Sequence, residues 1–74
     1  MKASTSQKGL ITRLLKTLEL DTRTISLMHK NVLSNARLWS PSLNGKDMDT
    51  WLGGLNGFQA GLLISQLNLE VANG

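Results

Sequence analysis

Apolar side chains recur every three or four residues in three stretches of the chain, which is the spacing of one face of an α-helix. The first stretch predicts a helix from about Ser6 or Gly9 to Glu19, with charged side chains on the opposite face. Ser4 and Gln7 have the spacing of a capping box and predict its start. The apolar face consists of Leu10, Ile11, Leu14, Leu15 and Leu18.

The second stretch predicts a helix from about Thr24 to Leu38, preceded by favourable N-cap residues at Asp21 and Thr22. We expect this helix to end before Pro41, because the residue before a proline is pushed out of the helical conformation. Its apolar positions are Ile25, Met28, His29, Val32, Ala36 and Trp39, with Leu33 at the margin. We expect His29 to be a buried structural residue, the alternative being a ligand or catalytic role.

The third stretch predicts a helix from about Met48 to Leu69, with Asp47 or Asp49 as its N-cap. No segment alternates with period two for long enough to indicate a strand. The predicted fold class is therefore all-α, a small three-helix domain, which could be a helix-turn-helix followed by a C-terminal dimerisation helix. We expect one domain over 1–74, with a flexible N-terminus at 1–8, a basic helical pair at 9–39, a connector at 40–47, a glycine-ridged apolar helix at 48–70 and a frayed tail at 71–74.

The composition excludes several kinds of site. The chain of 74 residues has no cysteine and one histidine, which excludes a disulfide framework, a thiolate zinc site, a catalytic thiol and a paired-histidine metal motif. Its five acidic residues are too sparse for a calcium loop. No group of residues requires catalysis, so we expect a protein that is not an enzyme and holds no cofactor or metal.

The most apolar stretch, 51–64, contains polar residues and glycines and is shorter than the roughly twenty residues that a bilayer span needs. The N-terminus has no apolar run of signal-peptide length. We therefore expect a cytoplasmic protein with no membrane partner.

Charge is divided unevenly along the chain. Residues 1–40 carry seven Lys and Arg side chains against two acidic ones, whereas residues 41–74 carry one against three. A basic half joined to a mildly acidic, apolar half suggests that one half meets an anion and the other meets a protein surface.

Arg23, Lys30 and Arg37 are seven residues apart, so on one continuous helix they would share a face. Such a face, with Ser26 and Ser34 between the cations, could contact phosphates and base edges in a DNA groove. A solvated face of a bundle helix is the alternative interpretation.

The segment 14–38, LLKTLELDTRTISLMHKNVLSNARL, resembles the helix-turn-helix of LuxR/NarL-type regulators. The resemblance rests on Leu18, Leu20, Thr24, Ile25, Val32 and Leu33. It implies that Thr24 touches a phosphate, that Ser26, Leu27 and Lys30 face the bases, and that Arg23 flanks them.

The predicted third helix carries a row of small residues, Gly53, Gly57, Gly61 and Ser65, at intervals of four. Such a ridge lets another helix approach closely. Beside it lies an apolar stripe of Trp51, Leu55, Phe58, Leu62 and Leu69. The pattern indicates a helix–helix seam within the fold or in a homodimer, with a foreign protein partner or a lipid surface as alternatives. The expected interface residues are Trp51, Leu55, Gly57, Phe58, Gly61 and Leu62.

These features favour a small DNA-binding transcriptional regulator that acts as a homodimer, with Arg23, Thr24, Ser26, Leu27, Lys30 and Arg37 as its DNA-binding residues. The alternative function is a small helical adaptor or inhibitor, of the kind encoded by phages and mobile elements, which docks on a protein partner through its C-terminal helix.

Overall fold

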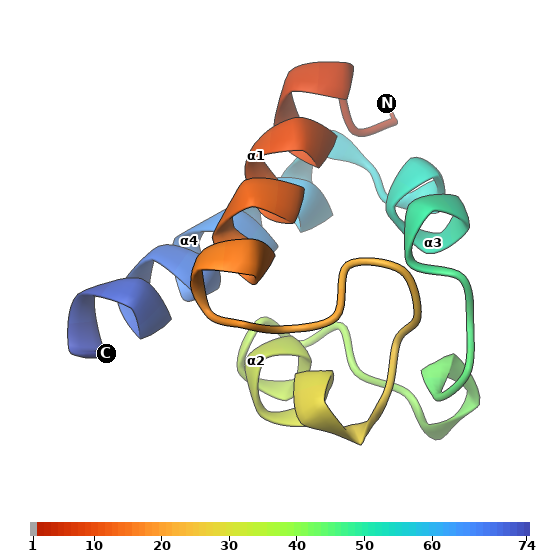
Figure 1. Ribbon diagram of the computed structural model, residues 1–74. Coiled ribbons are helices and arrows are strands. Elements are labelled where there is room, and N and C mark those ends of the chain that lie inside the picture. Colours follow the sequence, from red (N-terminus) through yellow and green to blue (C-terminus); the bar gives the residue numbers. More distant parts are fainter. Residues whose placement is uncertain (1) are drawn as a thin grey trace.

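The computed structural model describes residues 2–74 and contains four α-helices and two short 3-10 helices (Figure 1). Within that range the only β-pairing is two isolated bridges, so the all-α prediction is confirmed. The elements are α1 (Thr5–Thr17), η1 (Leu27–His29), α2 (Lys30–Asn35), η2 (Pro41–Leu43), α3 (Met48–Gly54) and α4 (Gly57–Asn73). None of the helices in residues 2–74 is both long and apolar enough to cross a bilayer.

The predicted capping box starts α1. The amide of Gln7 donates to Oγ of Ser4 at 3.1 Å, and the amide of Ser4 donates to Oε1 of Gln7 at 3.0 Å. The helix therefore begins inside the segment that we expected to be flexible. Before it, the amide of Ala3 donates to the carbonyl of Leu55 at 2.7 Å, which fastens this end of the chain to the junction between α3 and α4.

The predicted helix from Thr24 to Leu38 is wrong at both ends. Residues 23–25 are not helical and pair with the connector: the amide of Ile25 donates to the carbonyl of Lys46, and the amide of Met48 donates to the carbonyl of Arg23, each at 2.8 Å. The helical part is limited to η1 and α2, and Arg37 then takes a left-handed conformation with φ 62°. The long-range pairing, which buries Ile25 completely, takes precedence over local helix formation.

The predicted helix from Met48 to Leu69 is two helices. Leu55 is extended, with ψ 148°, and Asn56 begins α4 with its own capping box to Gln59. The amide of Gln59 donates to the side chain of Asn56 at 2.7 Å, and the return bond is 3.0 Å. Asp47, one of the two predicted caps, accepts the amide of Thr50 at 2.9 Å and starts α3. At its other end α4 continues to Asn73, so most of the expected frayed tail is helical.

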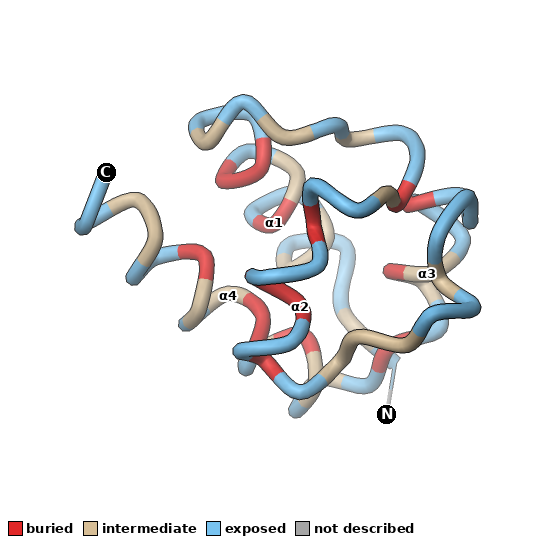
Figure 2. The backbone as a smooth tube through the Cα atoms, turned by 90° about the horizontal axis from the view of Figure 1, so that it is seen from below, coloured by how far each residue is buried: buried red, intermediate tan, exposed pale blue. Residues whose placement is uncertain are grey.

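The core forms where α1 and α4 pack together and α2, α3 and the segment 23–25 close over them (Figure 2). Gln7 Nε2 donates to the carbonyl of Gly57 at 3.3 Å, so both helices begin at the same end of the molecule. The buried apolar residues are Ile11, Leu14, Leu15, Ile25, Val32, Leu33, Ala36, Met48, Leu52, Leu55, Ala60, Leu63 and Leu67. Met28, expected in the core, is 55% exposed, whereas His29 beside it is buried.

Candidate functional site

Helix α4 has apolar side chains on two opposite faces. Ala60, Leu63 and Leu67 face the core and are at most 1% exposed. Phe58, Leu62 and Leu69 lie on the other side and are 75%, 38% and 56% exposed. We call the side formed by Phe58, Gly61, Leu62, Ser65, Leu69 and Ala72 the outer face of α4; these positions fall on one side of a helix because they repeat at intervals of three and four.

The outer face carries no ionisable side chain. The chain has no Lys, Arg, Asp, Glu or His between Asp49 and Glu70. Glu70 lies outside the outer face, where its carboxylate accepts a hydrogen bond from Gln66 Nε2 at 3.2 Å. It lines a small hollow of about 230 Å³ together with the segment that follows α1. Burying an uncharged apolar face against another apolar surface is favourable, because it removes apolar area from water.

The glycines do not form a close-packed ridge within the monomer, so that interpretation is wrong. Gly53 belongs to α3, and Gly57 and Gly61 belong to α4. A Cβ atom added to Gly53 would lie 3.7 Å from the ammonium of Lys8, and one added to Gly57 would lie 4.0 Å from the amide oxygen of Gln7. A Cβ on Gly61 would meet nothing within 4 Å. Packing inside the fold therefore does not require a glycine at any of the three.

The structure brings three of the six predicted interface residues together on the outer face, namely Phe58, Gly61 and Leu62. Leu55 is buried in the core at the junction of α3 and α4, and Gly57 lies against Gln7. Trp51 is half-buried on α3. The stripe predicted from Trp51 to Leu69 is therefore divided by the break at Asn56. Sequence reasoning did not single out Ala72, and its spacing of three from Leu69 was the available signal.

The predicted DNA-binding residues do not lie on one helix. A helix-turn-helix has a turn of about three or four residues, whereas residues 18–29 separate α1 from α2. Thr24 is extended and pairs with Asp47. The structure places Arg23, Thr24 and Ser26 in the loop after α1, Leu27 at the start of η1, Lys30 at the start of α2, and Arg37 beyond its end. All but the half-buried Ser26 are exposed, but the expected shared helical face is absent.

Two polar side chains hold this loop in place. The amide of Ser26 donates to Nδ1 of His29 at 3.0 Å, so Nε2 carries the ring proton and donates it to the carbonyl of Asp21 at 2.8 Å. His29 is only 1% exposed, and the prediction of a buried structural histidine is confirmed. The carboxylate of Asp21 accepts the amides of Arg23 and Thr24, and these bonds lower its pKa below the ordinary 3.8.

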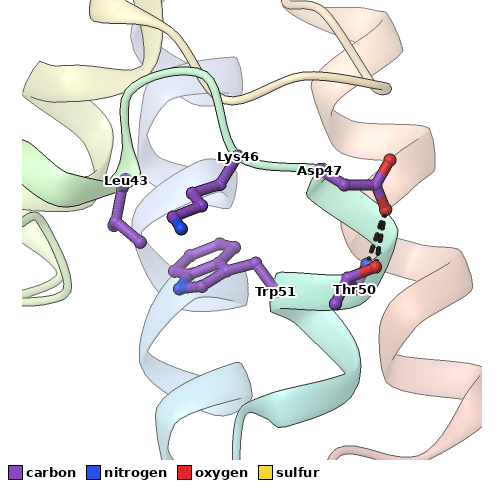
Figure 3. A pocket seen from close by; sticks show the side chains of 5 residues that line it. All are labelled: Leu43, Lys46, Asp47, Thr50 and Trp51. Carbon is purple, nitrogen blue, oxygen red and sulfur yellow. Dashed lines mark hydrogen bonds between the residues drawn. The ribbon is translucent and has the colours of Figure 1, made fainter.

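One hollow lies between the connector and α3 (Figure 3). It has a volume of about 340 Å³ and is lined by Leu43, Lys46, Asp47, Thr50 and Trp51. The ammonium of Lys46 points toward the indole of Trp51, whereas Asp47 turns to Thr50 (Figure 3). Asp47 Oδ2 accepts both the amide and the hydroxyl of Thr50 at 2.9 Å, which lowers the pKa of Asp47. The one carboxylate at this hollow is therefore engaged in capping α3.

In the described part of the chain, no group of three or more His, Cys, Asp or Glu side chains could hold a metal ion. The outer face of α4 therefore stands out as an exposed apolar surface that packing within the described chain does not use. In comparisons with known proteins, no family model, curated protein or solved structure matches this chain.

Proposed function

We propose that this chain is a protein-binding module, rather than an enzyme, which docks on another protein surface through the outer face of α4. The observation that supports this most directly is that α4 buries one apolar face and leaves Phe58, Leu62 and Leu69 in solvent. Each square ångström of apolar surface removed from water stabilises a complex by about 25 cal/mol. Exposed aromatic side chains are also frequent anchors of protein interfaces.

Photo-crosslinking in cells tests this proposal. Phe58 is replaced by a photoreactive phenylalanine analogue, and the same analogue replaces Lys16, an exposed residue of α1, as the matched control. We expect illumination to give a protein adduct from position 58 and none from position 16. Absence of an adduct at 58, or equal adducts at both positions, would overturn the proposal.

A second candidate function is nucleic-acid binding by a dimeric regulator. Arg23, Lys30 and Arg37 are all exposed, and none takes part in an ion pair within the described chain, where Lys8 and Asp49 form the one pair at 3.3 Å. Free cations on a basic protein attract the phosphate backbone and release its counterions. Because these three lie on different elements, we propose phosphate contacts rather than base recognition by one inserted helix.

A titration of fluorescent duplex DNA at increasing salt tests this second candidate. The variant Arg23→Gln, Lys30→Gln, Arg37→Gln is compared with Lys2→Gln, Arg13→Gln, Lys16→Gln, which loses the same charge. We expect the first variant to bind more weakly. The slope of its log binding constant against log salt concentration should also be shallower, by about 0.9 for each lost phosphate contact. No binding at low salt, or equal losses in both variants, would reject it.

A further inference from the structure

We propose that the partner of the outer face is a second copy of this chain, with the two α4 helices packed antiparallel across a two-fold axis at Ser65. This inference rests on the proposed function and names its partner. A two-fold contact uses the same patch on both copies, so the patch must be complementary to itself.

The order of large and small residues along α4 meets that requirement. Ser65 is the middle residue of the 17 in Gly57–Asn73, so antiparallel helices that overlap fully have Ser65 at the axis. In that register Leu69 lies opposite Gly61 of the second copy, and Phe58 lies opposite Ala72. Leu69 and Phe58 thus each meet a small residue, whereas Leu62 lies opposite Asn68, and the open space around Gly61 is where Leu69 fits.

The distribution of charge is compatible with self-pairing. The chain has a net charge of +3, so two copies repel each other wherever cations meet. All eight Lys and Arg residues lie in 2–46, and none is on α4. Pairing through the uncharged outer face therefore brings two basic molecules together without bringing like charges into contact.

The position of α4 makes the contact sterically open. Its C-terminal end projects beyond the other helices in both views of the backbone (Figures 1 and 2). The 17 residues of α4 span about 25 Å. A contact along one helix of this length is near the lower limit of about 1,000 Å² for a specific interface, so we expect a dissociation constant in the micromolar range.

Sedimentation equilibrium of the purified chain measures the association. We expect the mass to rise from 8.1 kDa at low concentration to twice that value at high concentration. Leu62→Glu and Leu69→Glu should keep the protein monomeric with an unchanged helical circular dichroism spectrum, because both side chains are exposed in the monomer. Ser34→Glu, which adds the same charge on α2, should still dimerise.

The absence of cysteine allows the orientation to be tested by crosslinking. A disulfide needs Cα atoms within about 7 Å. In the antiparallel pair the two Ser65 residues meet, whereas the two Ala72 residues lie about 21 Å apart. We therefore expect Ser65→Cys to crosslink rapidly on oxidation. Ala72→Cys should crosslink only as slowly as the control variant Ser42→Cys, which places a cysteine in the connector.

The outcomes separate this inference from the function on which it rests. Rapid crosslinking of Ala72→Cys would indicate parallel helices and overturn the antiparallel arrangement. A purified chain that stays monomeric at all concentrations, yet gives an adduct with a different protein from position 58 in cells, would overturn self-pairing and leave the protein-binding function in place. A chain that dimerises only through other surfaces, unaffected by Leu62→Glu, would overturn self-pairing through α4.

Discussion

His29 shows how a single buried polar residue holds an irregular segment in place. Both of its ring nitrogens bond to backbone groups, one at Ser26 and the other at Asp21. Asp21 and Ser26 lie between α1 and η1, outside any regular helix, so no intrahelical hydrogen bond satisfies these backbone groups. The imidazole supplies the hydrogen-bond partners that a regular helix or strand would otherwise provide, which explains why this polar side chain is buried in an otherwise apolar core.

We expect His29→Ala to lower the free energy of unfolding by about 2–4 kcal/mol, because it leaves a cavity and removes the partners of two backbone groups. His29→Asn should lose less, since its side-chain oxygen can still accept the amide of Ser26. Leu27→Ala, at a neighbouring side chain that is 65% exposed, should change stability by no more than about 0.5 kcal/mol. Urea unfolding followed by circular dichroism measures all three, and equal losses in His29→Ala and Leu27→Ala would contradict this role.

Asp21 and Asp47 make stability depend on pH in the acid range. The backbone amides that they accept lower the pKa of each carboxyl in the folded state below its ordinary 3.8. The folded state therefore binds fewer protons than the unfolded one, so this contribution is complete above about pH 4 and is lost as the pH falls further. Urea midpoints measured from pH 7 to pH 2 should decline below pH 4. The decline should be shallower for Asp21→Asn with Asp47→Asn than for the unchanged protein, and an unchanged slope would refute the assignment.

At the scale of elements, the sequence predicts helices where caps and apolar spacing agree. The Ser4–Gln7 box and Asp47 start α1 and α3 as expected. The same rule would have divided the third predicted helix, because Asn56 and Gln59 form an equivalent box within the apolar run. The extended conformation at Thr24 has no such local signal, because it depends on residues 45–48, which lie over twenty positions away.

Gly61 and Gly45 should respond in opposite directions to the same substitution. Gly61 lies inside α4 with open space around it, so Gly61→Ala should stabilise the monomer by about 0.5–1 kcal/mol. Gly45 has φ 89°, which side chains rarely adopt, so Gly45→Ala should destabilise it by about 1 kcal/mol. Urea unfolding at low protein concentration measures both. A destabilising Gly61→Ala under those conditions would mean that the outer face is packed in the monomer.

For the whole molecule, the decisive contact is that of α1 with α4, two helices at opposite ends of the chain. The predicted apolar face of α1 is confirmed at Ile11, Leu14 and Leu15, because this helix packs through one face, but it is wrong at Leu10, which is exposed. The buried side of α4 was not predictable, because both of its sides are apolar and spacing alone does not tell which side is buried. Of the predicted interface residues, Phe58 and Leu62 are exposed and Gly61 is half-buried, so they stay a prediction, whereas the buried Leu55 is wrong.

Leu67 and Leu69 test which side of α4 holds the molecule together. Leu67 is fully buried, so Leu67→Ala should lower the free energy of unfolding by about 2–5 kcal/mol. Leu69 is 56% exposed, so Leu69→Ala should change it by no more than about 0.5 kcal/mol in the monomer. Urea unfolding followed by tryptophan fluorescence at low protein concentration compares the two variants. A similar loss of unfolding free energy for both would contradict the assignment of Leu67, and not Leu69, to the core.

The pairing of the first helix with the last has a consequence for synthesis on the ribosome. Translation releases α1 before α4 is synthesised, so Ile11, Leu14 and Leu15 lack their partner helix until then. Because the contacts that bury them span some fifty residues, this fold forms only after α4 has emerged from the ribosome. A nascent chain stalled before residue 57 would remain a substrate for chaperones and proteases, and native packing of α1 would appear only after α4 emerges.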